Sequence, residues 1–569
     1  MTDTSTPPAA SQSERVNVAD RLRWFAASQA AQPAIVVQRR NRITGRISYE
    51  TASFTELNER ADRIACGVRS LGVPAGARLA LLVKPGIDFV ALVFGMLRAG
   101  VVIILIDPGM GRRNLIQCLA DAEPEGFIAI PLAQMVRAAF RRRFPKSRWY
   151  VTVGPRWWFG GLTLAELERH GSGNKSDSQL PMTAADDPAA IIFTTGSTGP
   201  PKGVLYLHRN FDRQVEQIQS HYGIAAGNVN LACFPLFGLF NAAMGVTTVF
   251  PDMDCSRPAT ADPRNIVAAI HDHGATQSFA SPAVWRKVAA HCVLHGLRLP
   301  TLREAYSAGA PVPPQVVHQM VSVMAEEGRM HTPYGATEAL PVSTIDSEEI
   351  ESGTRAAWAG GYGTCVGRMF SGIEYRVIRI VDGPICTIDR AETLPARQIG
   401  ELIVRGPVVT PRYVTRVEAN ATAKIHDVAG GGTWHRMGDA GYLDEEGRFW
   451  FCGRVAHRVV MKDQTLYTDP VEGIFNQVEG VARSALVGVG PRGEQRPVVV
   501  IELMTPIRIK GGYEGLTRRL RETGSHFPTT AVIDTFLFHP SFPVDIRHNS
   551  KIFREQLAVW AAAELERNR

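Results

Sequence analysis

Short β-rich runs alternate with helical stretches along the first part of this chain, and this alternation constrains the fold more than any other feature. Apolar runs at 78–83, 101–106 and 125–130 have the length of buried strands, and the segments between them have the apolar spacing of helices. Parallel strands need a crossover connection, which is usually a helix. This order therefore predicts an α/β fold with largely parallel sheets.

The chain has 569 residues, which is more than one hydrophobic core usually supports, so at least two domains are expected. Beyond about residue 400 the pattern changes to glycine-punctuated strands, with DEEG (444–447) as a hairpin turn. The last part ends in a helical stretch at 552–566. We predict a disordered tail at 1–17, a large N-terminal domain of parallel and mixed sheets with a β-rich subdomain at 18–452, and a small mobile α+β domain at 453–569.

Composition excludes several classes of protein. The eight cysteines form no C-x-x-C pair, so neither a disulfide framework nor a zinc site is indicated. The longest apolar stretch, at 89–109, is interrupted by Arg98, Ala99 and Gly100, which favours a helix followed by a buried strand over a membrane span. Because the N-terminal segment is polar and lacks an apolar core, we expect a cytoplasmic protein.

The net charge of +7 and a pI near 9.0 admit an anionic ligand, nucleic acid or a membrane surface and select none of them. No nucleic-acid-binding signature accompanies the charge, so no nucleic-acid partner is expected. The densest basic cluster, at 137–150, is followed by Trp157, Trp158 and Phe159. One interpretation of 137–159 is a solvated surface, and the other is a docking surface for a protein partner or a peripheral contact with lipid headgroups.

The sequence TTGSTGPPKG, at 194–203, has the ingredients of an anion-binding loop. Gly196 and Gly199 can adopt positive φ and turn backbone N–H groups inward, while Lys202 supplies a charge. The Walker A pattern does not fit, because Pro201 precedes the lysine and a glycine follows it. A plain Gly/Ser/Thr loop between a strand and a helix is the alternative interpretation.

This loop resembles the phosphate loop of the adenylate-forming superfamily, which includes acyl-CoA synthetases, peptide-synthetase adenylation domains and firefly luciferase. Other stretches resemble further motifs of that family in the same order, so the resemblance covers the chain from about residue 18 to its end. They are SAGAP (307–311), YGATE (334–338), GELIVRGP (400–407), WHRMGD (434–439), GR (453–454) and NSK (549–551). Six ordered motifs exclude chance matching, and the chain is identified as a member of this family.

The resemblance implies ATP and Mg²⁺ as cofactors and gives each motif a role. Thr337 is implied to reach the α-phosphate, and Glu338 to bind Mg²⁺, which prefers oxygen ligands. Lys551 is implied to neutralise charge between the substrate carboxylate and the α-phosphate. The predicted catalytic residues are Lys202, Thr337, Glu338 and Lys551. The predicted nucleotide-binding residues are Thr194, Thr195, Gly196, Ser197, Thr198 and Gly199 at the phosphates, Gly309, Ala310, Pro311, Tyr334 and Gly335 at the base, and Asp439 with Arg454 at the ribose.

The implied reaction is attack of a carboxylate on the α-phosphorus, which gives acyl-AMP and pyrophosphate. Two positions depart from the thioester-forming members. Their small domain rotates about a hinge residue that is usually Asp or Lys, and here this residue is Ala456. Their pantetheine tunnel is lined by a glycine-bearing loop, and here the aligned positions are Lys462 and Asp463. A charged pair at this point is expected to obstruct a thiol arm.

A third departure lies at 234–245, where the family often has a histidine and this chain has Gly238. The loss of a ring is expected to open volume beside the adenylate carbon in an apolar acyl pocket. The predicted pocket residues are Phe234, Phe237, Phe240 and Met244, with ordinary core packing as the alternative. His208 either points into this pocket as a base for a hydroxyl or packs in the core.

These features most resemble the branch of the family that makes β-lactones in bacterial long-chain olefin biosynthesis. That branch activates a 2-alkyl-3-hydroxy fatty acid, whose own 3-hydroxyl then closes on the acyl carbon without a second substrate. The resemblance implies pathway partners, namely a β-lactone decarboxylase, a dehydrogenase and a thiolase. The close alternative is a long-chain fatty acyl-CoA ligase or fatty acyl-AMP ligase, and the third is a catalytically inactive ATP-binding scaffold.

Overall fold

The structure is a computed structural model that describes residues 16–41, 43–173, 180–194, 200–309, 311–504, 512–544 and 551–567. Most of the predicted tail, residues 1–15, lies outside the described residues. Val16 and Asn17 do not belong to it, because the Val16 N–H donates to the Thr183 carbonyl (3.0 Å) and Asn17 Nδ2 donates to the Leu97 carbonyl (2.9 Å). These two residues, which the prediction places in the tail, are therefore hydrogen-bonded to the folded chain.

The first sheet has seven strands in the order β7-β6-β5-β3-β4-β8-β9. All its strand pairs are parallel except β8 with β9, which is antiparallel. The three apolar runs predicted as strands form β3, β4 and β5 at its centre, which confirms the predicted parallel sheet. The strands are β3 (Arg78–Leu82), β4 (Val102–Leu105), β5 (Gly126–Ala129), β6 (Trp149–Thr152), β7 (Leu162–Thr163), β8 (Pro188–Phe193) and β9 (Gly203–Leu207).

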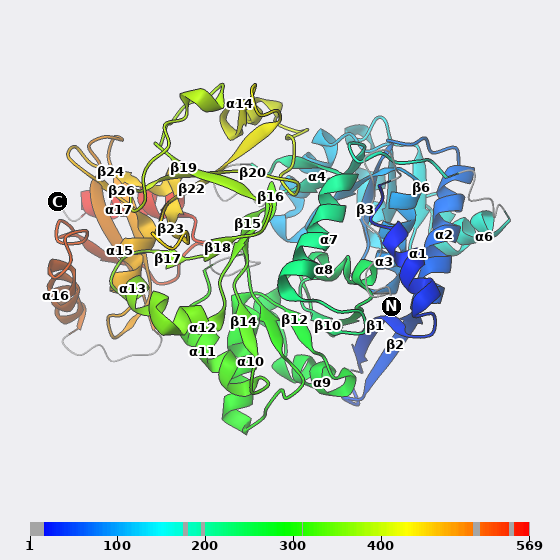
Figure 1. The fold of residues 1–569 in the computed structure, drawn as a ribbon, viewed down its shortest axis with the longest axis horizontal. Helices are drawn as coiled ribbons and strands as arrows, with labels where there is room; N and C mark the ends of the chain where they lie inside the picture. Colours follow the sequence, from blue (N-terminus) through cyan, green and yellow to red (C-terminus); the bar gives the residue numbers. More distant parts are fainter. Residues whose placement is uncertain are drawn as a thin grey trace.

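The second sheet also has seven strands, in the order β14-β13-β12-β10-β11-β1-β2. It is parallel except for the edge pair of β1 and β2. Figure 1 shows this sheet below the first, with helices around both. The strands are β1 (Pro33–Arg40), β2 (Ile47–Ser53), β10 (Val229–Ala232), β11 (Thr247–Phe250), β12 (Gln277–Phe279), β13 (Glu304–Tyr306) and β14 (Arg329–His331).

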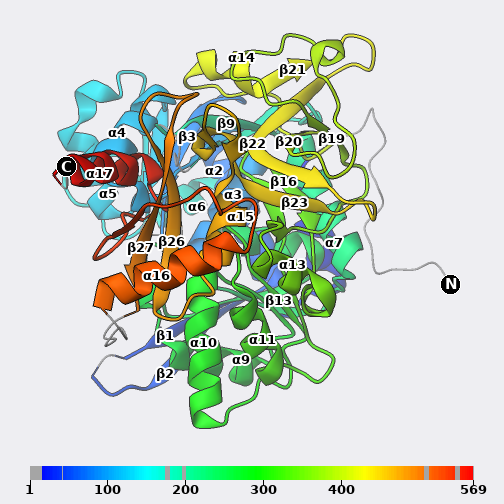
Figure 2. The ribbon, with the colours of Figure 1, turned by 90° about the vertical axis from the view of Figure 1, so that its left-hand side faces the viewer.

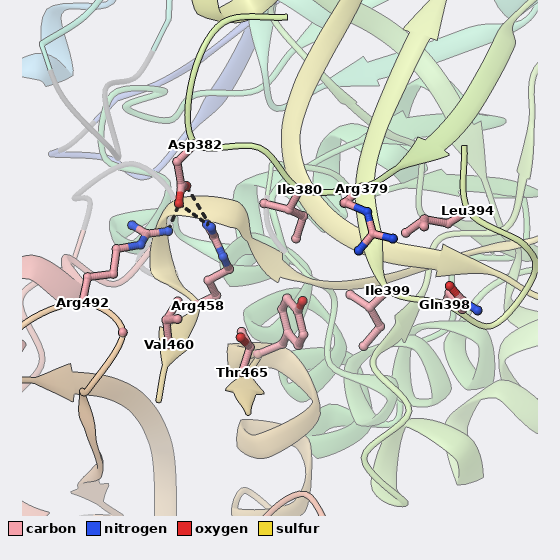
Figure 3. A pocket seen from close by; sticks show the side chains of 12 residues that line it. Arg379, Ile380, Asp382, Leu394, Gln398, Ile399, Arg458, Val460, Thr465 and Arg492 are labelled. Atoms are coloured by element: carbon pink, nitrogen blue, oxygen red, sulfur yellow. Dashed lines mark hydrogen bonds and ion pairs between the residues drawn. The ribbon is translucent and has the colours of Figure 1, made fainter. Parts of the chain in front are cut away.

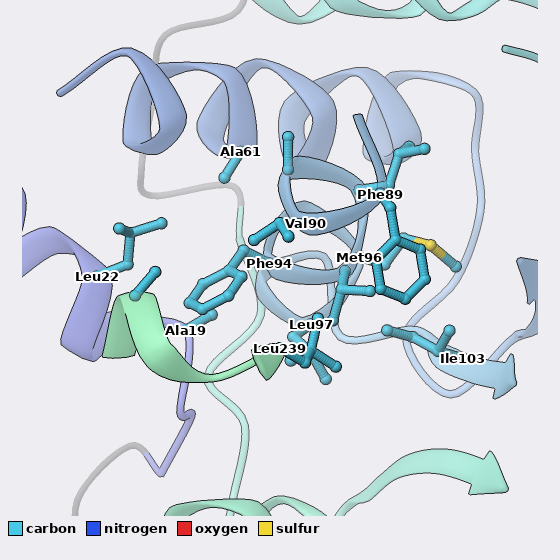
Figure 4. Packing of buried hydrophobic residues seen from close by; sticks show 14 of the residues in the cluster. Ala19, Leu22, Ala61, Phe89, Val90, Phe94, Met96, Leu97, Ile103 and Leu239 are labelled. Carbon is cyan, nitrogen blue, oxygen red and sulfur yellow. The ribbon is translucent and has the colours of Figure 1, made fainter. Parts of the chain in front are cut away.

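Helix α3 (Ile87–Arg98) packs in the core between these sheets, and it accounts for the longest apolar stretch of the sequence. Its side chains are buried on every face, and Figure 4 shows Phe89, Val90 and Phe94 among the apolar residues of neighbouring elements. Arg98 is fully buried and pairs with Asp62 at 2.7 Å. The stretch is therefore a core helix followed by the buried strand β4, as the interrupting residues predict. No helix in the described parts of the chain is long and apolar enough to cross a membrane.

An antiparallel subdomain follows, as the glycine-punctuated pattern predicts. Its sheet has the order β17-β23-β22-β20-β19, with β21 paired to β22. The predicted turn at 444–447 connects β22 to β23, and the Gly447 N–H donates to the Asp444 carbonyl (3.2 Å). The strands are β17 (Thr364–Cys365), β19 (Glu374–Ile378), β20 (Gly400–Arg405), β21 (Lys424–His426), β22 (Thr433–Leu443) and β23 (Phe449–Arg454); β15 (Tyr334–Ala336) and β16 (Ala339–Thr344) lie in a smaller sheet.

The part of the chain after β23 has hydrophobic clusters of its own. Two clusters contain only residues beyond position 458, in accord with the predicted small domain. Figure 2 shows its helices and strands together on the face that the view presents. The elements are β24 (Val459–Val460), β25 (Thr465–Leu466), α15 (Thr468–Phe475), β26 (Val481–Val489), β27 (Arg496–Leu503), α16 (Gly512–Ser525), β28 (Phe536–Phe538) and α17 (Arg554–Arg567).

Candidate functional site

The predicted phosphate loop connects β8 to β9. Phe193 and Gly203 are register partners in this antiparallel pair, so the loop joins two strands and not a strand and a helix. Its base is closed by two hydrogen bonds, from the Thr194 N–H to the Lys202 carbonyl (3.0 Å) and from the Lys202 N–H to Thr194 Oγ1 (3.1 Å). Thr195, Gly196, Ser197, Thr198 and Gly199 lie outside the described residues.

The turn between β15 and β16 presents Thr337 and Glu338 next to this loop. Tyr206, on β9, donates its hydroxyl to the Thr337 carbonyl at 2.6 Å. The Tyr413 hydroxyl donates to Glu338 Oε1 at 2.5 Å. Lys202 Nζ lies 4.8 Å from the centre of the Tyr413 ring, within the range of a cation–π contact. Tyr413 therefore links the predicted phosphate lysine to the predicted metal ligand.

Asp439, Arg454 and Tyr334 form a hydrogen-bonded cluster, in which Asp439 is buried and the other two residues are partly buried. Asp439 on β22 and Arg454 on β23 are register partners. The two oxygens of Asp439 accept from Arg454 Nη1 (2.7 Å) and from the Tyr334 hydroxyl (2.5 Å). The Asp439 charge raises the pKa of Arg454, and burial together with the same charge raises the pKa of Tyr334. The cluster therefore holds a charged guanidinium and a neutral phenol at the two oxygens of Asp439.

A second buried polar group, which no sequence motif predicts, lies beside Glu338. Lys424 on β21 is 5% exposed and its Nζ donates to the Thr410 carbonyl at 2.6 Å. The N–H and hydroxyl of Thr410 both donate to the Glu338 carbonyl at 2.9 Å. Burial lowers the pKa of Lys424 to about 7, and the Glu338 charge acts in the opposite direction. Glu338, Thr410 and Lys424 are far apart in the sequence and meet only in the folded chain. No local sequence pattern therefore predicts this group.

His435 is the register partner of Lys424 and is also buried. Burial lowers the pKa of His435 well below its ordinary value, and the Lys424 charge adds to this effect. Its Nδ1 lies 3.1 Å from the Ala423 carbonyl, so the neutral ring donates from Nδ1. The histidine is thus a neutral neighbour of the lysine.

The residues predicted to line an acyl pocket are found mainly in packed regions. The Phe240 ring lies 4.9 Å from that of Phe211 and 6.3 Å from that of Phe94, and Met244 is buried in the same cluster. The Phe234 ring lies 6.4 Å from that of Phe279. The Phe237 side chain lies outside the described parts of the structure.

Gly238, which is expected to open volume in an acyl pocket, lies in a tightly packed place, and its role in a pocket stays a prediction. A Cβ atom at this position would lie 2.6 Å from the Ala232 Cβ. The glycine therefore permits close packing of the short helix α8 (Pro235–Gly238) against β10. His208, the first residue of α7 (His208–Tyr222), is 0% exposed, which favours its packing interpretation.

The remaining predicted residues are Gly309, Ala310, Pro311, Gly335 and Lys551. Gly309 has φ = +91°, a conformation that favours glycine, and Gly335 lies where a Cβ would come within 2.7 Å of the Ala339 carbonyl oxygen. Pro311 is exposed, and Ala310 lies outside the described residues. Lys551 is half-buried and lies shortly before α17, which begins at Arg554 and contacts the segment after β23 through Glu555 and His457 (3.1 Å).

A cavity of about 590 Å³ lies at the contact of the antiparallel subdomain with the C-terminal part of the chain. Figure 3 shows Asp382 between Arg458 and Arg492, with ion pairs of 2.8 and 3.1 Å. Hydrogen bonding to Arg458 lowers the pKa of Asp382. None of the predicted nucleotide-binding residues lines this cavity. These ion pairs connect the antiparallel subdomain to the C-terminal part of the chain, close to Ala456.

A family model described as AMP-binding enzyme matches residues 22–414, which is more than half of the chain. The chain belongs to the AMP-binding enzyme family. The predicted superfamily is confirmed, and this member is an adenylate-forming, AMP-forming ligase that uses ATP. The architecture is accordingly that of the AMP-binding fold. It consists of two seven-stranded sheets, the antiparallel subdomain and the C-terminal part.

Two relatives within this family are similar over nearly their whole length. The olefin beta-lactone synthetase of Stenotrophomonas maltophilia is 46% identical, with 97% of this chain and 99% of the relative covered. The olefin beta-lactone synthetase of Xanthomonas campestris pv. campestris is also 46% identical, with 96% and 98% covered.

Two solved structures show the same fold. The amide bond synthetase McbA from Marinactinospora thermotolerans has a TM-score of 0.75 at 20% identity, with 95% of this chain and 99% of that chain covered. ATP-bound MatB from Rhodopseudomonas palustris has a TM-score of 0.76 at 20% identity, with 96% and 99% covered. The predicted fold class is confirmed.

Proposed function

We propose that this enzyme converts a long-chain 2-alkyl-3-hydroxy fatty acid into a β-lactone. The carboxylate attacks the α-phosphorus of ATP, and pyrophosphate leaves. The 3-hydroxyl oxygen then attacks the carbonyl carbon of the acyl-AMP, its proton is released, and AMP leaves. The observation that carries this proposal is the 46% identity, over nearly full length, to two enzymes named olefin beta-lactone synthetase.

In this proposal the phosphates of ATP lie between the loop at 194–202 and the turn that holds Thr337 and Glu338. The hydrogen bonds from Tyr206 and Thr410 fix the backbone of that turn, and Tyr413 orients the Glu338 carboxylate. Preorganised groups of this kind stabilise developing charge without reorganising during the reaction. Lys202 supplies the positive charge on the same side.

Glu338 fits the proposed role of Mg²⁺ ligand. Among the described residues, no group of three or more His, Cys, Asp or Glu side chains could hold a metal ion by itself. Mg²⁺ is usually bound by one or two carboxylates together with substrate phosphates and water, and a single glutamate beside a phosphate site meets that description. When bound, the ion neutralises phosphate charge. Glu338 and its Tyr413 hydrogen bond define where the carboxylate oxygen is held.

Asp439 and Arg454 are proposed to hold the ribose. Each oxygen of Asp439 already accepts one hydrogen bond and retains a lone pair for a ribose hydroxyl. Tyr334 is fixed by the same carboxylate and packs 6.1 Å from the Phe449 ring, so its ring is oriented before the nucleotide binds. Gly309, Ala310, Pro311 and Gly335 complete the proposed base-binding side, and Lys551 on the proposed small domain 453–569 is the residue that acts at the α-phosphate.

The lactone step is proposed to need no thiol. Lys462 and Asp463 are both exposed in the turn between β24 and β25, and a charged turn is a poor lining for a pantetheine arm. An internal hydroxyl has its proximity built into the substrate, which replaces a bimolecular step by a unimolecular one. A β-lactone decarboxylase, a dehydrogenase and a thiolase are the proposed pathway partners.

The experiment compares two synthetic acids that differ only in the 3-hydroxyl, each with ATP and Mg²⁺ and without coenzyme A. The hydroxy acid should give continuous pyrophosphate and AMP release with lactone as product. The acid that lacks the hydroxyl should give one turnover and bound acyl-AMP. Strict dependence of the hydroxy acid on coenzyme A would favour an acyl-CoA ligase, and absence of pyrophosphate release with either acid would favour an inactive scaffold.

A further inference from the structure

Helix α5 (Pro131–Ala139) turns polar residues inward and apolar residues outward. Gln134 is 0% exposed, and its Nε2 donates to the Val151 carbonyl at 2.9 Å. Arg137 is also buried, and its Nε donates to Gln134 Oε1 at 3.1 Å. Leu132 and Met135 are 60% and 38% exposed. This is the reverse of a surface helix in water, where the apolar face packs on the core.

Two neighbouring segments extend the outward apolar face. Phe140, directly after α5, is 45% exposed, and Trp157 and Trp158 are 52% and 73% exposed. The tryptophan loop is joined to α5 because Arg137 Nη2 donates to the Phe159 carbonyl at 3.1 Å. Together with three arginines they form a surface that we call the α5 patch. It consists of Leu132, Met135, Phe140, Arg141, Arg142, Arg143, Trp157 and Trp158.

The arginines of the α5 patch lie in the exposed short helix η2 (Arg141–Arg143). Within the described parts of the chain, no carboxylate forms an ion pair with any of the three. Arg143 Nη2 donates to Gln117 Oε1 of α4 (Arg112–Asp121) at 3.3 Å. The exposed Arg113 lies one helical turn before Gln117 and extends the basic surface. Figure 2 shows α4 and α5 at an outer edge of the molecule.

We propose that the α5 patch binds the surface of an anionic lipid bilayer. Arginines without carboxylate partners are complementary to anionic headgroups, and each adds to binding at such a surface. Tryptophan favours the membrane–water interface, and exposed Leu, Met and Phe can enter the boundary with the acyl chains. Tryptophans this exposed project outward, as insertion requires. The α5 patch contains none of the residues proposed for the reaction, so membrane binding does not depend on lactone synthesis.

The test is co-sedimentation of the full-length protein with vesicles of equimolar phosphatidylglycerol and phosphatidylcholine, against vesicles of phosphatidylcholine alone. The protein should bind the anionic vesicles, and added salt should weaken binding. Each arginine near an anionic surface raises the partition coefficient onto the membrane about fivefold. The affinity of the triple variant R141E/R142E/R143E for anionic vesicles should therefore fall by roughly a hundredfold or more. The affinity of the double variant W157S/W158S for the same vesicles should fall by at least about tenfold.

Matched controls separate the α5 patch from net charge and general hydrophobicity. The triple variant R46E/R286E/R355E changes the same total charge at exposed arginines on other elements, and L294S removes an apolar side chain that is 79% exposed. Both should bind vesicles as the wild type does. Pyrophosphate release with a short soluble hydroxy acid should be unchanged in every variant, which verifies folding.

Three results would overturn the proposal. One is that the wild type does not bind anionic vesicles. Another is that R141E/R142E/R143E and R46E/R286E/R355E lose vesicle binding equally. The third is a change in oligomeric state of the patch variants without any wild-type vesicle binding, which would make the α5 patch an interface between protein molecules.

Discussion

At the scale of single residues, the candidate site depends on hydrogen bonds that hold a few charged groups in fixed positions. Glu338 is held at its side chain by Tyr413 and at its backbone by Thr410, whose own carbonyl accepts from Lys424. The proposed roles of Lys202 and Glu338 come from motif order. The supporting tyrosine and lysine were not predicted, because they lie 75 and 86 positions beyond Glu338 and only the folded chain unites them.

The Tyr413→Phe variant tests the support of Glu338. Removing the hydroxyl deletes a hydrogen bond to a charged carboxylate, which is worth about 1.5–3 kcal/mol. We expect the rate of pyrophosphate release to fall by at least about tenfold and the Mg²⁺ concentration for half-maximal rate to rise. Tyr375→Phe, on β19 of the antiparallel subdomain, is the matched control and should behave as wild type. Equal Mg²⁺ dependence in both variants would remove Tyr413 from this role.

The Lys424→Met variant tests the buried ammonium. The folded pKa of Lys424, about 7, is below its ordinary value, so between pH 7 and about 10 the unfolded chain binds more protons at this group. Its contribution to the free energy of unfolding therefore rises with pH over that window, by up to about 1.4 kcal/mol per pH unit. The stability of Lys424→Met relative to wild type should fall from pH 7 to pH 9.5 in denaturant unfolding. Parallel curves for the two proteins would contradict this.

Among the secondary-structure elements, the central strands β3, β4 and β5 of the first sheet and the β22–β23 hairpin could be predicted, because buried strands and tight turns have local signatures. Contacts between elements could not be predicted. The close packing of Gly238 on α8 against β10 follows only from the approach of Ala232. The segment GVLYL (203–207) forms β9 by pairing antiparallel with β8, and this pairing makes the predicted phosphate loop the connection between two adjacent strands.

The contact between α15 and β17 predicts a dependence of stability on pH. Asp469 on α15 accepts from Thr364 Oγ1 on β17 at 2.8 Å. Burial raises the pKa of Asp469 to about 7, and the Glu472 charge acts in the same direction. The folded chain thus binds the proton more tightly than the unfolded chain, so this stabilisation is present at low pH and is lost as pH rises through about 7.

The Asp469→Asn variant carries a neutral side chain at every pH. Its Tm relative to wild type should therefore increase between pH 5 and pH 8, as measured by thermal unfolding. Asp463→Asn, at an exposed position in the β24–β25 turn, should show a constant difference from wild type. A constant difference for Asp469→Asn as well would mean that Asp469 does not titrate in this range in the folded protein.

At the scale of the whole molecule, the two parts of the chain meet through ion pairs of Asp382 with Arg458 and Arg492 and through the Asp469 contact. Lys551 lies in the C-terminal part, whereas Glu338 and Asp439 lie in the large one. The proposed reaction needs these groups at one nucleotide, and it needs the acyl-AMP to be attacked from within the same substrate. Family membership accounts for adenylate formation, and the internal attack is the central claim.

Isotopic labelling tests that claim most directly. A 2-alkyl-3-hydroxy acid with both carboxylate oxygens as ¹⁸O is incubated with the enzyme, ATP and Mg²⁺, and the products are analysed by mass spectrometry. Internal attack on the acyl-AMP should give one ¹⁸O in AMP, one in the lactone carbonyl, and an unlabelled ring oxygen that comes from the 3-hydroxyl. A lactone that retains both labels, with unlabelled AMP or with ADP, would show that the hydroxyl was activated instead of the carboxylate and would contradict the account.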